Sequence, residues 1–296
     1  MVAVRSILLI RGTQPAVYEA AATTSADAVV IDLASPEVSA EREAARALAA
    51  KHAPLIARRG RGAHVRISDA RSGELEADVE AVAGAAIAAV LLSGAEEPQD
   101  VRDADIALRR REMRRKVAPG HMRLIPEVDS AAGLRALPAM LGAVDRHGAA
   151  ALNVEALAHD MGLGGALAPS MPLLEHAMAT VAFAARAAKV PWLLLASHVD
   201  QGIRAALANR AHALGAGGVY VRSEAEAAGF RQLFTPARER VELARAMLEE
   251  WERVRTREEW VGAVHGQLVD RRSVRLARQV VAADAEHRTL DEARRR

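Results

Sequence analysis

The sequence predicts a closed (β/α)₈ barrel, the TIM-barrel architecture, followed by a small C-terminal helical cap. Three observations support this fold class. Eight short apolar runs recur along the chain, helical stretches lie between nearly all of them, and most runs end on a polar residue. Runs of four to seven aliphatic residues are typical of strands buried on both faces of a parallel sheet, and eight such β/α units favour closure into a barrel.

The expected strands are rich in Val, Ile, Leu and Ala. In chain order they are Ser6–Ile10, Ala28–Asp32, Ala63–Ile67, Ala88–Leu92, Met122–Pro126, Ala149–Val154, Trp192–Ala196 and Gly218–Arg222.

Two stretches illustrate the strand, loop and helix order of each unit. VVIDL is followed by a loop and then by EREAARALAAKH, whose alanine content and apolar spacing predict a helix. ASHVDQGIRAALANRAHALGAGGVYV repeats that order, with glycines ending the helix before the last strand. We therefore expect the barrel to span residues 1–235.

The C-terminal part has a different pattern. Residues 237–255 have the periodicity of an amphipathic helix, VGAVHGQLVD resembles a loop with brief strand character, and a second short helix begins near Arg271. We expect a helical cap over residues 236–282 and a charged, frayed tail over 283–296.

Composition narrows the classes of function. Forty Lys and Arg against 38 Asp and Glu give a net charge of +2, which does not favour binding to nucleic acid. The chain has no cysteine, so disulfides, thiolate metal sites and a cysteine nucleophile are excluded. No apolar run is long enough to span a membrane and no secretory leader is evident, so we expect a cytoplasmic protein.

Active sites of such barrels lie at the carboxyl ends of the strands. The polar residues that follow the expected strands are therefore the candidates for chemistry: Arg11, Asp32, Arg66, Ser93, Asp129, Glu155, Ser197, His198 and Arg222.

Seven motifs, in order along nearly the whole chain, resemble the citrate lyase β-subunit and malyl-CoA lyase family of the HpcH/HpaI aldolase superfamily. They are RSILLIRGTQP with SADAVVIDLASPE, HVRIS, AAVLLSGAEEPQDV, PEVDSAAG, NVEALAHDMG, FTPARERVELARAMLEE and HGQLVD. The resemblance implies a homotrimeric or hexameric TIM barrel that cleaves or forms a carbon–carbon bond next to a CoA or acyl-carrier thioester. It also implies a small carboxylate substrate held by Mg²⁺.

The sequence departs from the family pattern at the positions for chemistry. The two metal carboxylates that the resemblance implies fall at Asp129, where the family has Glu, and at Ala156, where it has Asp. We expect any Mg²⁺ to be held by Asp129 and Glu155, since Mg²⁺ commonly takes one or two carboxylates with substrate and water. Glu127 shares the strand face of Asp129 and is an alternative ligand, or else a structural carboxylate.

Two matched positions are intact and are the expected catalytic residues. The resemblance implies that Arg66 binds the carboxylate of the substrate, although an ion pair with Asp32 is the structural alternative. It also implies that Asp270 acts as general acid or base in a neighbouring subunit's site, whereas an N-cap for the helix that begins at Arg271 is equally compatible. Arg11 and Asp32 are the further substrate contacts that we expect, although a surface ion pair is the structural alternative for Arg11.

Two functional hypotheses follow. The first is a divergent citrate lyase β-subunit-like lyase or aldolase that acts on a keto acid or CoA thioester. The second is a barrel that has lost catalysis and binds a small anion or a protein partner. It is favoured by Ala156 in place of the metal Asp, by Ser93 in place of a lysine of the resembled motif and by Ala34 in place of the glutamate of the resembled DLED motif. A metal-independent lyase that uses the new arginines is a third possibility.

Overall fold

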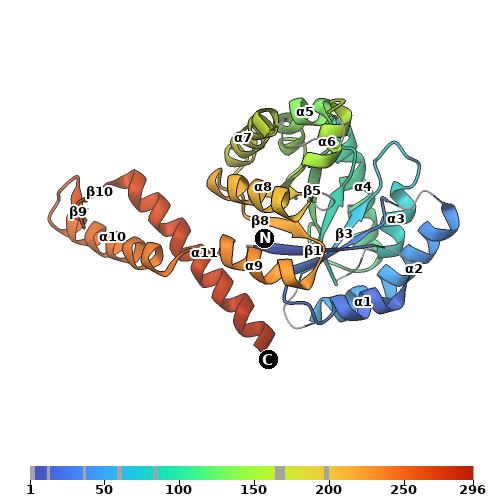
Figure 1. Ribbon diagram of the computed structural model, residues 1–296, viewed down its shortest axis with the longest axis horizontal. Coiled ribbons are helices and arrows are strands. Elements are labelled where there is room, and N and C mark those ends of the chain that lie inside the picture. The colour runs from blue at the N-terminus through green and yellow to red at the C-terminus, as the bar shows by residue number, and fades with distance from the viewer. Residues whose placement is uncertain are drawn as a thin grey trace. The chain divides into compact units, whose positions relative to one another are not determined.

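The chain forms a closed barrel of eight parallel strands, which confirms the predicted fold class (Figure 1). The computed structural model describes residues 4–11, 14–35, 38–58, 62–82, 84, 86–163, 171–196 and 200–295. Each strand pairs with the next in the sequence, and β1 pairs with β8 to close the barrel. The strands are β1 (Ser6–Ile10), β2 (Ala28–Asp32), β3 (Gly62–Ile67), β4 (Ile87–Leu92), β5 (Arg123–Val128), β6 (Ala150–Asn153), β7 (Trp192–Leu195) and β8 (Gly218–Val221).

Helices alternate with these strands and surround the barrel (Figure 1). They are α1 (Pro15–Ala21), α2 (Ser39–Ile56), α3 (Leu75–Val82), α4 (Pro98–Arg114), α5 (Ala131–Leu141), α6 (Val154–Asp160), α7 (Met171–Ala187), α8 (Gln201–Ala213) and α9 (Glu224–Phe234).

Polar side chains cap the N-termini of helices that follow directly after a strand. Ser130 caps α5 by accepting a hydrogen bond from the N–H of Gly133 at 3.1 Å, and Asn153 caps α6 by accepting from the N–H of Ala156 at 3.1 Å. Such caps satisfy N–H groups that have no partner within the helix. They fix where each helix leaves the mouth of the barrel, which is the end where the strands terminate.

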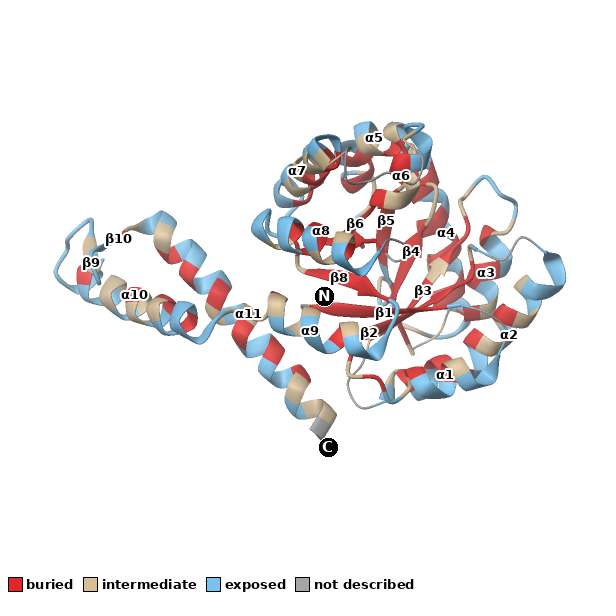
Figure 2. Cartoon of the chain, viewed as in Figure 1, coloured by how far each residue is buried: buried red, intermediate tan, exposed pale blue. Residues whose placement is uncertain are grey.

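Small and aliphatic side chains fill the interior of the barrel, and Figure 2 shows the barrel strands as mostly buried. Alternate residues of each strand point inward, so Ile7 and Leu9 of β1 lie in the same cluster as Ala28 and Val30 of β2. Tyr220 of β8 contributes an aromatic ring to this interior cluster. Because of the same alternation, side chains at the mouth also point inward.

The C-terminal part forms a second compact unit, and the boundary between the two units falls at residues 232 and 233. It contains α10 (Arg238–Thr256), a hairpin of β9 (Gly262–Val264) and β10 (Gln267–Val269), and α11 (Arg271–Arg295). Apolar side chains of α10 and α11, among them Val241, Met247, Val274 and Ala277, form its core.

The last helix is longer than the sequence analysis expected. We expected a short helix and a frayed tail from residue 283, but α11 continues without a break to Arg295. Asp284 lies 3.1 Å from Arg245 of α10 and 3.1 Å from Arg288 one turn onward, and these ion pairs hold the helix through the start of the charged segment. Among the described residues, no helix has the length and apolar character needed to cross a membrane.

A buried histidine makes the free energy of unfolding of the barrel depend on pH. His64 of β3 is 2% exposed, and burial lowers its pKa from 6.5 to about 4. Between these pH values the unfolded chain binds more protons than the folded one, so the free energy of unfolding decreases as the pH falls from 6.5 to 4. A shift of this size corresponds to about 3 kcal/mol.

We therefore expect His64→Leu to flatten the pH dependence of stability over this range. Chemical denaturation of both proteins at pH 7, 6, 5 and 4 measures the effect, and the difference between them removes the contribution of carboxylates common to both. Parallel curves for the two proteins would contradict the assignment.

Candidate functional site

Charged side chains meet at the mouth of the barrel, where β1, β2, β3 and β5 end. Arg11 follows β1, Asp32 is the last residue of β2, and Arg66 and Glu127 lie near the ends of β3 and β5. The structure brings these residues together through hydrogen bonds and ion pairs. Because side chains alternate between the two faces of each strand, those of Asp32, Arg66 and Glu127 share the inward face of their strands and lie above the aliphatic layer of the interior.

The central contact is a bidentate ion pair between Arg66 and Glu127. The guanidinium donates from Nε to Oε2 of Glu127 at 2.6 Å and from Nη2 to Oε1 at 2.9 Å. The Arg66 side chain is 12% exposed, and the Glu127 side chain is fully buried. Asn153 donates to Glu127 Oε1 at 2.8 Å, so the carboxylate is fixed on two sides. Glu127 is thus a structural carboxylate, one of the two roles that the sequence left open.

Asp32 is the second counter-ion of Arg66. Its Oδ1 lies 3.2 Å from Arg66 Nη1, and its Oδ2 accepts from Arg11 Nε at 2.8 Å and from Ser35 Oγ at 2.6 Å. Burial acts to raise the pKa of Asp32, but Arg66, Ser35 and Arg11 together lower it below its usual value. The ion pair between Arg66 and Asp32 that was the structural alternative for Arg66 is therefore present.

Asp129 is the third carboxylate at the mouth, and its environment differs from those of Glu127 and Asp32. Its Oδ2 accepts from the N–H of Gly94 at 2.8 Å, and Ser93 Oγ lies 3.5 Å away. Burial and the nearby charge of Glu127 raise the pKa of Asp129 to about 6, despite the opposing effects of Gly94 and Arg66. Gly94 has a φ of +62°, and an added Cβ would lie 2.7 Å from Cβ of Asp69, so glycine is required to aim this N–H.

The mouth offers fewer oxygen ligands for Mg²⁺ than the resemblance implies, and Asp129 and Glu155 are the carboxylates that would hold the ion. Ala156 offers no oxygen ligand, and the two carboxylate oxygens of Glu127 are bound by Arg66 and Asn153. Glu155 lies in the first turn of α6, where its charge acts on Arg204. Within the described part of the chain, no three His, Cys, Asp or Glu side chains gather closely enough to hold a metal ion.

Two further candidates cannot be placed, because Ser197 and His198 lie outside the described residues. Conversely, the sequence does not indicate Asn153 or Gly94 as residues of the mouth. The spacing Asn153 to Ala156 at the start of a helix is the signal for the cap, but nothing in the sequence indicates that the same amide also reaches Glu127.

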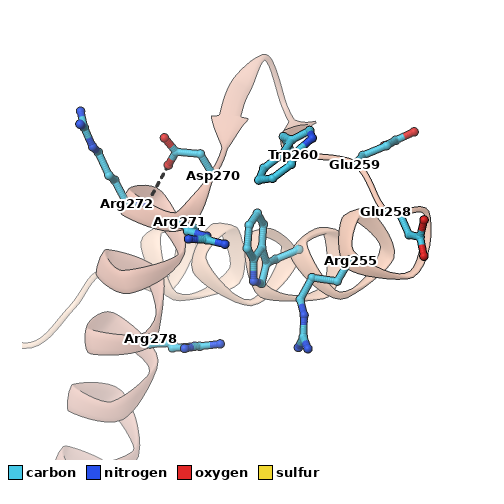
Figure 3. A pocket seen from close by; sticks show the side chains of 9 residues that line it. Arg255, Glu258, Glu259, Trp260, Asp270, Arg271, Arg272 and Arg278 are labelled. Atoms are coloured by element: carbon cyan, nitrogen blue, oxygen red, sulfur yellow. Dashed lines mark hydrogen bonds between the residues drawn. The ribbon is translucent and has the colours of Figure 1, made fainter.

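Asp270 belongs to the second unit and has the N-cap geometry that was its alternative role. Its Oδ1 accepts from the N–H of Arg272 at 2.9 Å (Figure 3) and from the N–H of Ser273 at 2.8 Å. These backbone contacts, with those to the Ser273 side chain and the charge of Arg272, lower the pKa of Asp270. It lines a hollow of about 670 Å³ that also contains Trp251 and Trp260, the latter 83% exposed.

Comparisons with known proteins agree with this architecture. The family model described as HpcH/HpaI aldolase/citrate lyase matches residues 5–223. CitE from Mycobacterium tuberculosis, solved in complex with magnesium, acetoacetate and coenzyme A, is 25% identical; the match covers 96% of this chain and 98% of that chain, with a TM-score of 0.71.

Two other solved structures support the fold alone. A citrate lyase from Burkholderia xenovorans is 17% identical with a TM-score of 0.75, covering 97% of this chain and 95% of that one. Haloferax volcanii malate synthase, solved as a magnesium/glyoxylate complex, is 14% identical with a TM-score of 0.68, covering 98% and 94%. No curated protein matches the sequence.

The ion pair at the centre of the mouth makes a stability prediction. Arg66→Ala leaves the buried Glu127 and Asp32 without their shared cation, so we expect a loss of about 3–5 kcal/mol in the free energy of unfolding. Replacing both partners with apolar residues, as Arg66→Met with Glu127→Leu, is expected to cost less than Arg66→Ala. Urea denaturation of the three proteins measures this, and a single-variant loss below about 1 kcal/mol would contradict it.

Proposed function

Because the chain belongs to the HpcH/HpaI aldolase/citrate lyase family, we propose that it is a carbon–carbon lyase that acts on a carboxylated substrate at the mouth of the barrel. The substrate class is a keto acid or a CoA thioester. The M. tuberculosis relative, solved with acetoacetate and coenzyme A, supports this choice. The observation that carries the proposal is the position of Asp129, a half-buried mouth carboxylate next to the positive charge of Arg66.

In the proposed cleavage, Asp129 accepts the proton of a substrate hydroxyl. The carbon–oxygen double bond forms as the neighbouring carbon–carbon bond breaks, and the electron pair of that bond passes into the enolate of the departing fragment. The enolate then takes up a proton, which balances the reaction. The Arg66 charge and the Ser93 hydroxyl are the groups at hand to stabilise developing negative charge, and the N–H of Gly94 holds Asp129 in place.

Our further proposals concern the metal ion, the role of Asp270, the oligomeric state and the location of the protein. Mg²⁺ held by Asp129 and Glu155 is a matter for titration, and the proposed reaction takes no step through a metal. Asp270 as general acid or base would have to act against a lowered pKa, which keeps its carboxylate ionised at neutral pH. A homotrimer or hexamer and a cytoplasmic location are likewise proposals.

A second candidate function is a barrel that binds a small anion or a partner protein without catalysis. Two replacements favour it, Ala156 for a metal ligand and Ser93 for a lysine of the resembled motif. The internal neutralisation of Arg66 by Glu127 favours it too, because this arginine already has its carboxylate.

Calorimetric titration with pyruvate, glyoxylate, oxaloacetate and acetoacetate, each with and without Mg²⁺, tests the substrate class. We expect at least one keto acid to bind without metal and Mg²⁺ to change its Kd little. A keto acid that binds only with Mg²⁺ would overturn the metal-independent form of the proposal, and a complete absence of binding would overturn the substrate class.

Turnover separates the lyase from the second candidate. Carbon–carbon cleavage or condensation, followed by NMR with the keto acids that bind and with acetyl-CoA, supports the lyase, and Asp129→Asn is expected to lower kcat by about 100-fold or more at unchanged fold. Binding with no turnover, or an Asp129→Asn variant as active as the wild type, would contradict the proposed role.

A further inference from the structure

Arg66 has little capacity left for a substrate. A guanidinium has five N–H donors, and four of the donor positions of Arg66 are occupied: two contacts go to Glu127, one to Asp32 at 3.2 Å and one to Ser93 Oγ at 2.7 Å. One N–H therefore remains, which is too few for the two parallel hydrogen bonds with which arginine grips a carboxylate. Another cation must supply that contact if a carboxylated substrate binds here.

Two other arginines lie at the carboxyl ends of β8 and β1, the pair of strands that closes the barrel. We call this place the β8–β1 seam. These strands pair with Leu8 opposite Val221, so Arg222, which follows β8, and Arg11, which follows β1, emerge at the same edge. Both line one hollow of about 610 Å³, a size typical of small-molecule sites.

The hollow has the charge that an anion requires. Arg222 is exposed and has no ion-pair partner among the described residues, and its positive charge also acts on Arg204. The Arg11 side chain is 42% exposed, with Nε bound to Asp32. The acid that lines this hollow, Glu224, accepts hydrogen bonds from Thr24 Oγ1 at 2.5 Å and from the N–H of Ser25 at 2.8 Å.

The rest of the wall is apolar. Leu8, Leu9 and Ile10 of β1 line the hollow together with residues of α1, which are Val17, Ala20 and Ala21. A site lined by two arginines and by aliphatic side chains suits an organic anion with a short aliphatic body better than a fully hydrated inorganic ion.

We propose that Arg222, together with Arg11, binds the carboxylate of the substrate at the β8–β1 seam, in place of Arg66. This inference rests on the proposed carboxylated substrate. It makes Arg222 a determinant of specificity for carboxylates that carry a short aliphatic chain, and it makes Arg66 a positioning residue that acts through Glu127 and Asp32.

The test is calorimetric titration of pyruvate and acetoacetate into wild type, Arg222→Gln and Arg11→Gln. We expect Arg222→Gln to weaken binding about tenfold, because a charge-assisted hydrogen-bonded contact is lost. Arg135→Gln is the matched control, since Arg135 is an exposed arginine on α5 that does not line the hollow. Methyl pyruvate, which has no charge, is expected to bind equally weakly to all four proteins, and inorganic phosphate more weakly than pyruvate to the wild type.

Thermal unfolding of each variant checks that it is folded, and the exposed position of Arg222 makes a stable variant the expected result. The inference is overturned if Arg222→Gln and Arg11→Gln both bind pyruvate as the wild type does, or if the wild type binds neither acid at millimolar concentration. Turnover with unaltered binding in Arg222→Gln would overturn the inference and leave the lyase standing. If Arg222→Gln weakens binding but the wild type shows no turnover, the inference stands and the proposed lyase activity is overturned.

Discussion

The buried ion pair between Arg66 and Glu127 is the constraint on which the mouth of this barrel depends. A charged guanidinium that is 12% exposed can be buried there only because Glu127 and Asp32 neutralise it at contact distance and so offset the cost of desolvation. Each neighbour follows from this arrangement: Asn153 fixes Glu127, Ser35 fixes Asp32, and Asp129 is left beside the pair. Removing the cation would therefore disturb the whole cluster.

Charged groups of both signs surround this pair at the mouth. Asp32, Glu127 and Asp129 gather on β2 and β5, whereas Arg11 and Arg222 lie at the β8–β1 seam. Under the proposal above, a carboxylated substrate would be attracted to the two arginines at the seam. Oriented fixed charges of this kind stabilise a charged transition state without reorganisation during the reaction.

The sequence predicts the architecture well because the signals involved are local and repeated. Short aliphatic runs fix the strands, the order of seven motifs matches one family, and the strand ends identify Arg66, Asp32 and Asp129 as mouth residues. The contact between Arg66 and Glu127 could not be predicted, because it joins β3 to β5 across the interior and depends on barrel closure. The sequence identified Glu127 as sharing a face with Asp129 but could not say which cation it meets. The continuation of α11 was missed because its contacts, such as Arg245 with Asp284, lie 39 residues apart.

The most direct measurement of the central claim is a crystal structure of the protein soaked with pyruvate and magnesium. The account predicts that Glu127 keeps both hydrogen bonds to Arg66 and that the carboxylate of pyruvate lies against Arg222 and Arg11. A structure in which Glu127 has turned away, with pyruvate bound to Arg66 and a magnesium ion beside Asp129, would contradict it.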